Sequence, residues 1–155
     1  MDKNEGEYKY GNIHKILAHS YAMYFVLFLI GIMLDIFLDI NFFNASFMAP
    51  LGIAALIFGS ILILWAQYTS RNLNKQNISK ETFCKGPYCY TRNPTHWGLF
   101  FLMLGFGIIT NSFFVVIFTL LAFIISRFTF LEKQEKILAE KYGVHYLEYK
   151  KSVKL

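Results

Sequence analysis

Thirteen residues near the middle of the chain, GPYCYTRNPTHWG at positions 86–98, gather side chains suited to binding a small charged molecule. Asparagine is favourable just before a helix and proline at its first position, so Asn93-Pro94 predicts a helix start. The first backbone N–H groups of a helix attract a carboxylate or phosphate, and Arg92 places a positive charge beside them. A loop that only caps a membrane helix explains the same residues, and spacing alone favours this simpler interpretation.

Glu132 and Glu135 form a second group with the spacing of a binding site. Three residues apart on a helix, they share one face, where paired carboxylates would bind a cation such as an ammonium group or a sulfonium. The ordinary alternative is a solvated first turn of a helix, and spacing alone favours it. His96 is a candidate proton acceptor, although a lone histidine beside Trp97 is more often an interfacial packing residue.

The composition indicates a single membrane domain. The chain has 155 residues, of which 55% are hydrophobic and 16% charged, and its mean hydropathy is +0.41. Soluble domains carry about 25% charged residues. Cys84 and Cys89 have no histidine or second cysteine pair at zinc spacing. Free thiols in a reducing compartment are therefore predicted in preference to a metal site or a disulfide.

Four apolar segments predict an all-α integral membrane fold: residues 17–38, 47–68, 94–109 and 113–130. The first two have the ~20 residues that cross ~30 Å of hydrocarbon as a helix. The third offers only ~24 Å at 1.5 Å per residue, so it is expected to begin inside protein rather than in lipid. The short linker 110–112 predicts that the third and fourth helices form a tight hairpin.

The remaining residues, 131–155, predict a cytosolic amphipathic helix that Gly143 interrupts, because hydrophobic residues recur there at helical spacing between Lys and Glu. All fifteen Lys and Arg lie in the N-terminal arm, in the 71–92 segment or from residue 127 onward. The positive-inside rule then places both termini in the cytoplasm. Asp35 and Asp39 fall near the opposite end and are expected to face water. The net charge of +5 reflects this topology and argues against a nucleic-acid partner.

The motif at 86–98 resembles the G-P-Y-x-x-x-R-H-P-x-Y-x-G signature of isoprenylcysteine carboxyl methyltransferases and phospholipid N-methyltransferases. It departs from that signature at Asn93, where the family has histidine, and at His96, where it has tyrosine. Each replacement keeps a hydrogen-bonding group but not its geometry. These two departures weaken single-residue roles more than they weaken the cofactor assignment.

The C-terminal segment is similar to the same family, in which a carboxylate pair precedes the pattern F-G-x-x-Y-x-x-Y-x-x-x-V. The corresponding residues here are Glu132 and Glu135, followed by Tyr142-Gly143, Tyr146, Tyr149 and Val153. The resemblance covers about residues 80–153. It is specific for the superfamily and much less so for the substrate.

The resemblance implies a methyltransferase that uses S-adenosyl-L-methionine and a hydrophobic or lipid-linked acceptor entering from the bilayer. The cofactor would sit in a cytosol-facing pocket, with His96 and Arg92 as the catalytic candidates and the backbone of 81–83 contributing. Which of the two glutamates contacts the cofactor is left open. Carried over position by position, the cofactor-binding residues are Phe83, Tyr88, Asn93, Pro94, Thr95, His96, Glu132 and Glu135.

Two other functions stay open at this point. Membrane sterol reductases that use NADPH share a related helical core, although four spans are few for such an enzyme. A non-catalytic membrane protein with a degenerate cofactor motif is favoured by the replacements at Asn93 and His96. The retention of Arg92, Pro94 and the carboxylate pair speaks against it. An apolar face on the first helix would also allow a homodimer.

Overall fold

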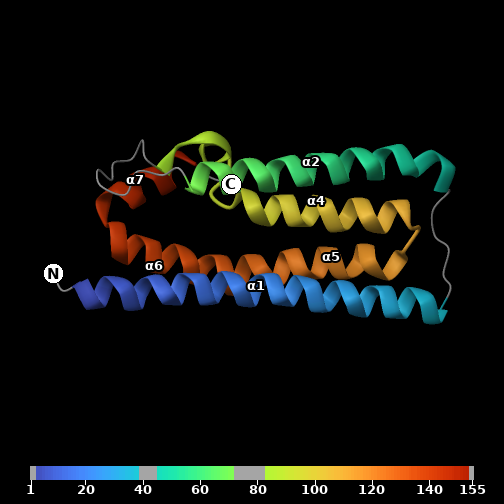
Figure 1. Ribbon diagram of the computed structural model, residues 1–155, viewed down its shortest axis with the longest axis horizontal. Coiled ribbons are helices and arrows are strands. Elements are labelled where there is room, and N and C mark those ends of the chain that lie inside the picture. The colour runs from blue at the N-terminus through green and yellow to red at the C-terminus, as the bar shows by residue number, and fades with distance from the viewer. Residues whose placement is uncertain (1–2, 39–44, 72–82, 154–155) are drawn as a thin grey trace.

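A computed structural model describes residues 3–38, 45–71 and 83–153, and every regular element in these ranges is helical (Figure 1). The predicted all-α fold is therefore confirmed. Two long helices come first, and a 3₁₀ turn opens the motif segment. In chain order the elements are α1 (Lys3–Leu38), α2 (Ala45–Arg71), the 3₁₀ turn η1 (Gly86–Cys89), α4 (Pro94–Ile109), α5 (Phe113–Ser126), the π turn η2 (Arg127–Leu131), α6 (Glu132–Tyr142) and α7 (Val144–Ser152).

Three helical stretches are long and apolar enough to cross a membrane: Lys15–Leu38, Phe47–Arg71 and Phe113–Tyr142. The third of these is longer than the predicted fourth segment, because α5, η2 and α6 form one continuous rod. α4 has the predicted bounds but only 16 residues. The count of four crossings, with the last two as a hairpin, stays a prediction.

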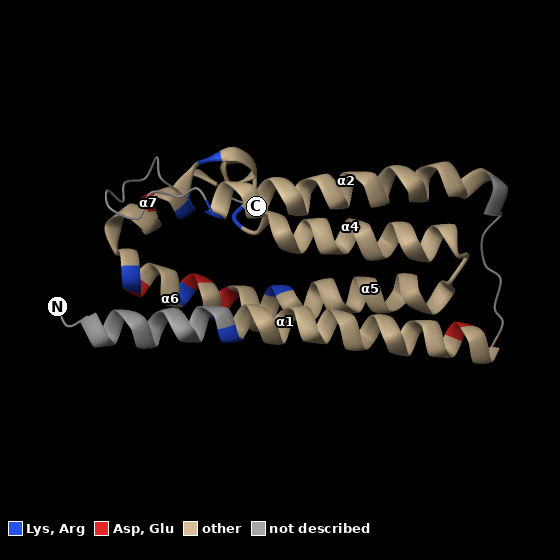
Figure 2. Cartoon of the chain, viewed as in Figure 1, with Lys and Arg blue, Asp and Glu red and all other residues tan. Residues whose placement is uncertain are grey.

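The helices lie along a common direction in two pairs, α2 beside α4 and α1 beside α5 (Figure 1). Many large apolar side chains on α1 and α2 face outward; Met33 is 70% exposed and Phe47 is 80% exposed. Hydrocarbon is the solvent that such surfaces require. Figure 2 shows Lys and Arg at the end of the bundle that holds α6 and α7. Asp35 lies near the other end, beside the start of α5.

Glycines allow the backbones of α2 and α4 to touch. A β-carbon on Gly59 would lie 2.6 Å from the carbonyl oxygen of Gly98 and 2.8 Å from the backbone nitrogen of Leu102. Gly52 and Gly105 meet in the same way, each seven residues from the first contact. A β-carbon on Gly52 would lie 2.9 Å from the carbonyl oxygen of Gly105. Small residues at the contact are typical of close helix packing in membranes, where the contact itself provides the attraction.

Asp35 binds the N-terminus of α5 instead of simply facing water. Its two carboxylate oxygens accept hydrogen bonds from the backbone N–H groups of Phe114, at 3.0 Å, and Val115, at 3.1 Å. Ser112 occupies the N-cap position of α5, but its hydroxyl bonds to Thr110 at 2.8 Å and caps no backbone group. The expectation for Asp35 was therefore wrong, because α1 brings it within reach of a helix start 79 residues later. Asp39 lies outside the described residues.

Replacing Asp35 by alanine is expected to lower the free energy of unfolding by about 2 kcal/mol, the upper range for loss of an N-cap. Both N–H groups lose a charged acceptor at once. Unfolding of detergent-purified protein with sodium dodecyl sulfate, followed by circular dichroism, measures the change. Ser112→Ala is the matched control and should shift the unfolding midpoint by less than a quarter as much. Equal losses in the two variants would show that α5 is capped locally.

The C-terminal segment folds as two helices separated at Gly143, whose φ is 56°. Tyr146, Tyr149 and Val153 of this segment are buried against Phe83. The predicted interruption at Gly143 is therefore confirmed. The apolar side of the segment covers the chain just before η1, so the C-terminus packs on the motif.

Candidate functional site

The motif begins with a turn that fits closely against α2. Gly86 has φ 55°, in the region that favours glycine, and a β-carbon there would lie 2.6 Å from the hydroxyl oxygen of Thr69. Asn93 and Pro94 hold the N-cap and first positions of α4, as predicted. The Asn93 side chain makes no capping bond, and its backbone N–H donates to the Thr91 hydroxyl at 3.4 Å.

A cavity of about 200 Å³ lies at the start of α4, and we call it the motif cavity. Six of the residues named from the sequence line it: Tyr88, Arg92, Asn93, Pro94, Thr95 and His96. The other lining residues are Leu17 and Tyr21 from α1, Gln67 and Ser70 from α2, and Gln134 from α6. No sequence pattern predicted these five residues, because they belong to no motif and come together only when α1, α2 and α6 pack.

Three buried polar atoms at the motif cavity have no hydrogen-bond partner among the described residues: Arg92 Nε, His96 Nε2 and Gln134 Oε1. Leaving a buried donor or acceptor unpaired costs about 1–3 kcal/mol. Three such atoms around one cavity suit it to a polar molecule, which would supply their partners.

His96 is held from its other ring nitrogen. Nδ1 lies 3.1 Å from the hydroxyl of Ser126 on α5, and that hydroxyl lies 2.9 Å from Ser20 on α1. The rings of Tyr21 and Tyr24 flank the imidazole, with ring centroids 5.8 and 5.9 Å away. His96 is thus a buried side chain fixed by three helices, rather than an interfacial residue.

A second and larger cavity, about 650 Å³, lies next to the first, and we call it the carboxylate cavity. Its centre is Glu135, which pairs with Arg92 at 2.7 Å and with Lys150 at 2.8 Å. Glu132 lines the same cavity but is exposed. Arg92 lines both cavities, so it connects Glu135 to the motif cavity. The pairing of Lys150 with Glu135 was not predicted from the sequence, because it depends on how α7 folds back.

Phe83 takes part in neither cavity. Its ring lies against those of Tyr142, Tyr146 and Tyr149, with centroid distances of 5.1, 5.6 and 5.6 Å. The structure thus places Phe83 in the packing between the motif and the C-terminal helices. Its assignment to the cofactor stays a prediction without geometric support. Glu81, the start of the backbone segment expected to contribute, lies outside the described residues.

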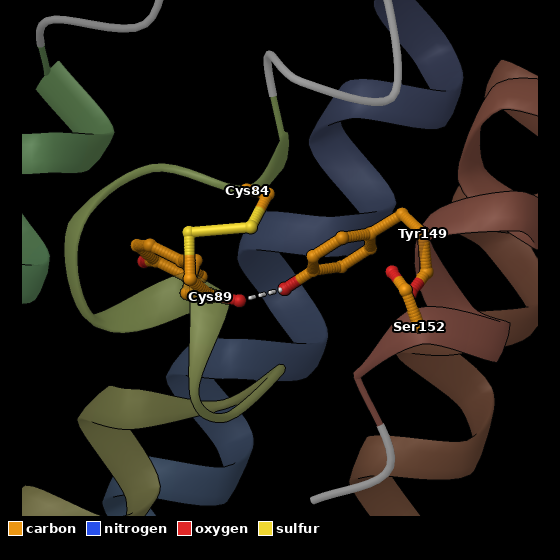
Figure 3. The surroundings of a disulfide bond; sticks show 5 residues. Cys84, Cys89, Tyr149 and Ser152 are labelled. Carbon is orange, nitrogen blue, oxygen red and sulfur yellow. Dashed lines mark hydrogen bonds between the residues drawn. A yellow bond between two sulfur atoms is a disulfide. The ribbon is translucent and has the colours of Figure 1, made fainter.

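The motif turn is held at two points, one by the C-terminal helix α7 and one by a link within the turn itself. The hydroxyl of Tyr149 donates to the backbone carbonyl of Tyr88 at 2.7 Å, and Cys84 and Cys89 form a disulfide across the turn (Figure 3). The prediction of free thiols was wrong. The 3₁₀ turn folds the chain back so far that the two cysteine Cα atoms are 4.5 Å apart, within the usual range for a disulfide.

Burial raises the pKa of the Tyr149 phenol above its usual value, and burial likewise raises the pKa of Tyr88. Both hydroxyls therefore stay protonated throughout the physiological pH range. Tyr149 consequently remains a hydrogen-bond donor to the motif turn throughout this pH range.

Tyr149→Phe is expected to lower the free energy of unfolding by about 1 kcal/mol, because it deletes one buried hydrogen bond and leaves the Tyr88 carbonyl without this donor. The comparison is Tyr90→Phe, which removes a hydroxyl from the same turn at a residue that is 74% exposed. Denaturation in mixed micelles compares the two. A Tyr90→Phe loss as large as that of Tyr149→Phe would refute the proposed contact.

Among the described residues no group of three or more His, Cys, Asp and Glu side chains is placed to hold a metal ion. The polar groups at the two cavities are hydroxyls, amides, an imidazole, guanidinium and ammonium groups, and carboxylates. This set binds charged and hydrogen-bonding organic molecules.

The comparison with known families agrees with the geometry. The model of the phospholipid methyltransferase family matches residues 26–145, which include α2, the motif, α4, α5 and α6. No curated protein and no solved structure matches the chain. Because the family match spans well over half of the sequence and includes both cavities' central residues, this chain belongs to the phospholipid methyltransferase family.

Proposed function

We propose that this membrane methyltransferase takes its methyl group from S-adenosyl-L-methionine and transfers it to a lipophilic acceptor. The observation that carries the proposal is the motif cavity, where Arg92, His96 and Gln134 present buried polar atoms without partners in the described part of the chain. A polar ligand is expected there, although the surrounding helices are among the most apolar in the protein.

The residues present fit this cofactor. S-adenosyl-L-methionine carries a hydrogen-bonding nucleoside at one end and an amino acid with both signs of charge at the other. The motif cavity offers the rings of Tyr21 and Tyr88 with amide and hydroxyl groups. The carboxylate cavity offers cations and anions together: Arg92, Arg127, Lys136 and Lys150 with Glu132 and Glu135. Arg92 belongs to both, so one molecule extending across it would meet both environments.

A third, apolar cavity supports a lipophilic acceptor. It measures about 430 Å³ and lies between α2, α4 and the motif turn. Aromatic side chains suited to a membrane interface surround its motif end, and apolar ones continue along the helices. It is lined by Phe58, Ile61, Leu62, Trp65, Pro87, Tyr90, Thr91, Trp97 and Phe101. A hydrocarbon chain in this groove would keep a reactive headgroup near the residues that form the motif cavity.

When bound, the cofactor supplies an electrophilic methyl group on a sulfonium. The protein's contribution is to orient the acceptor and exclude water, which is the main requirement of such a displacement. A carboxylate acceptor needs no base. An amine or thiol acceptor has to lose a proton, and His96 Nε2 is the candidate to receive it. We place the site and both termini on the cytoplasmic side, in agreement with the basic end of the bundle (Figure 2). A homodimer through α1 stays a prediction.

Calorimetric titration of detergent-purified protein with S-adenosylhomocysteine, and in parallel with NADPH, tests the proposal. Saturable binding of S-adenosylhomocysteine alone is expected. NADPH binding alone would favour a reductase, and binding of neither would favour a non-catalytic protein.

Two variants extend this test to the cavities. Glu135→Ala and His96→Ala are each expected to weaken S-adenosylhomocysteine binding roughly tenfold, the equivalent of one good polar contact. Lys151→Ala, an exposed cation adjacent to Lys150, is the control and should bind as the wild type does. Unchanged affinity in both cavity variants would refute the location of the site.

A further inference from the structure

Two buried serines, Ser20 and Ser126, join the first helix to the candidate proton acceptor. Their side chains are at most 1% exposed, and their hydroxyl oxygens are 2.9 Å apart. Ser126 lies 3.1 Å from His96 Nδ1. A continuous row of hydrogen bonds therefore runs from α1 through α5 to the start of α4. Neither serine belongs to a motif, and neither lines the motif cavity.

The hydroxyl of Ser126 is used differently from hydroxyls elsewhere in the apolar helices. Ser60 and Thr119 donate to the carbonyl four residues earlier in their own helices, Leu56 at 2.8 Å and Val115 at 2.7 Å. That local bond is the ordinary solution for a hydroxyl in a membrane helix. The hydroxyl of Ser126 instead lies within hydrogen-bond distance of the side chains of Ser20 on α1 and His96 on α4. These two contacts constrain the orientation of the His96 ring. A serine needed only for packing would not require contacts to other helices.

The contact at Nδ1 decides what Nε2 can do. A neutral imidazole carries its proton on one nitrogen and a lone pair on the other, and the bond made by one nitrogen fixes the role of the other. A serine hydroxyl accepts one hydrogen bond while donating another. Ser126 can therefore accept from Nδ1–H and donate to Ser20. The lone pair is then on Nε2, the buried atom that has no partner in the described ranges.

We propose that Ser126, supported by Ser20, is a positioning residue that keeps the proton of neutral His96 on Nδ1. His96 Nε2 then faces the motif cavity as a proton acceptor. The catalytic role of this arrangement rests on the function proposed above, and it applies to an acceptor that has to lose a proton, such as an amine, rather than to a carboxylate. An alkylammonium group passes one N–H proton to Nε2, leaving a neutral amine with a free lone pair and an imidazolium whose Nδ1–H still bonds to Ser126.

The position of the proton is measured directly by ¹⁵N nuclear magnetic resonance of the full chain in micelles, with ¹⁵N-labelled histidine side chains. His96→Gln identifies the His96 signals by their disappearance. We expect a protonated Nδ1 and an unprotonated Nε2 in the wild type, and a mixture of the two tautomers in Ser126→Ala. Thr119→Val removes a buried hydroxyl from the same helix and should leave the His96 signals unchanged. Ser20→Ala should shift the His96 signals toward the mixture by a smaller amount. This variant replaces Ser126→Ala in the test if Ser126→Ala does not fold.

A proton found on Nε2 in the wild type would overturn the proposal, as would identical spectra for the wild type and both serine variants. The measurement uses no methyl donor, so its outcome is separate from that of the proposed function.

The acceptor class is tested with methyl-labelled S-adenosyl-L-methionine and an alkylamine in mixed micelles. Ser126→Ala should lower kcat about tenfold, a part of the 10²–10⁴-fold effect of a general base, with the donor KM unchanged. Ser126→Thr, which restores a hydroxyl, should recover most of the rate. Methylation of a fatty acid but not of the alkylamine by the wild type would contradict the acceptor class.

Discussion

Replacement of Gly59 by alanine is expected to destabilise the protein by about 2 kcal/mol, the upper end of the cost of overpacking less the gain in helix propensity. The new methyl group would lie 2.6 Å from the Gly98 carbonyl oxygen and 2.8 Å from the Leu102 nitrogen. Both are backbone atoms, so no side-chain rotation relieves the clash, and overpacking of this kind costs about 1–3 kcal/mol or more. The better helix propensity of alanine, worth about 1 kcal/mol, offsets only a part. Denaturant unfolding in micelles measures the loss.

Two comparisons separate this effect from a general sensitivity of α2 and α4. Ala54→Leu adds more volume to the same helix at an exposed position and should be almost neutral. Gly98→Ala should cost less than Gly59→Ala, because the nearest backbone atom to its β-carbon, the Gly59 oxygen, is 3.0 Å away and the closer atom belongs to the Ile63 side chain. The reverse order of the two glycine variants would contradict the backbone contact between α2 and α4.

Removal of the Arg92 side chain is the second change with a large expected effect. The side chain of Arg92 is 11% exposed and that of Glu135 is 13% exposed, and their closest atoms are 2.7 Å apart. Truncating one partner of a buried ion pair typically costs about 3–5 kcal/mol, because the other charge stays buried. Lys150 still neutralises Glu135 in part, so Arg92→Ala is expected to lose about 3 kcal/mol of unfolding free energy.

A double-mutant cycle isolates the pair. Arg92→Ala and Glu135→Ala together should cost less than the sum of the single changes by about 1–3 kcal/mol, as expected for residues in contact. Arg92→Lys should lie between the wild type and Arg92→Ala, because an ammonium keeps the charge but not the planar fork of donors. Strict additivity of the two alanine substitutions would show that the ion pair does not contribute in solution.

Much of the architecture could be predicted because it depends on local sequence. The apolar run at 94–109 and the Asn93-Pro94 pair predicted both ends of α4, and the structure has the same bounds. The motif residues also lie together, because a helix start places neighbours in sequence around one cavity. Glu132 and Glu135 line a common cavity for the same reason, since residues three apart share a helix face.

The rest depends on contacts between residues distant in the chain, which no local pattern reports. Asp35 meets α5 only because α1 lies beside it, and Ser20 meets Ser126 across 106 residues. The disulfide depends on the backbone shape of η1, since cysteine spacing alone does not reveal how far the chain turns back. Phe83 was assigned through its nearness in sequence to the motif. The folding of α7 instead places it among tyrosines.

The π turn at Arg127–Leu131 determines which changes in length this segment can accept. A π turn closes its hydrogen bonds over five residues, whereas an α-helix closes them over four. Each residue of a helix advances the direction of its side chain by about 100°. Because the π turn takes up one extra residue in a single turn, deleting Thr129 would let α5 continue into α6 as a regular helix with Glu135 still directed toward Arg92. Inserting one residue into α6 before Glu135 would instead rotate Glu135 by about 100°, away from Arg92. Substitution of Thr129, which is exposed, would leave the direction unchanged. The π turn therefore lets this segment change in length by one residue while it keeps the angular phase at which the two cavities join.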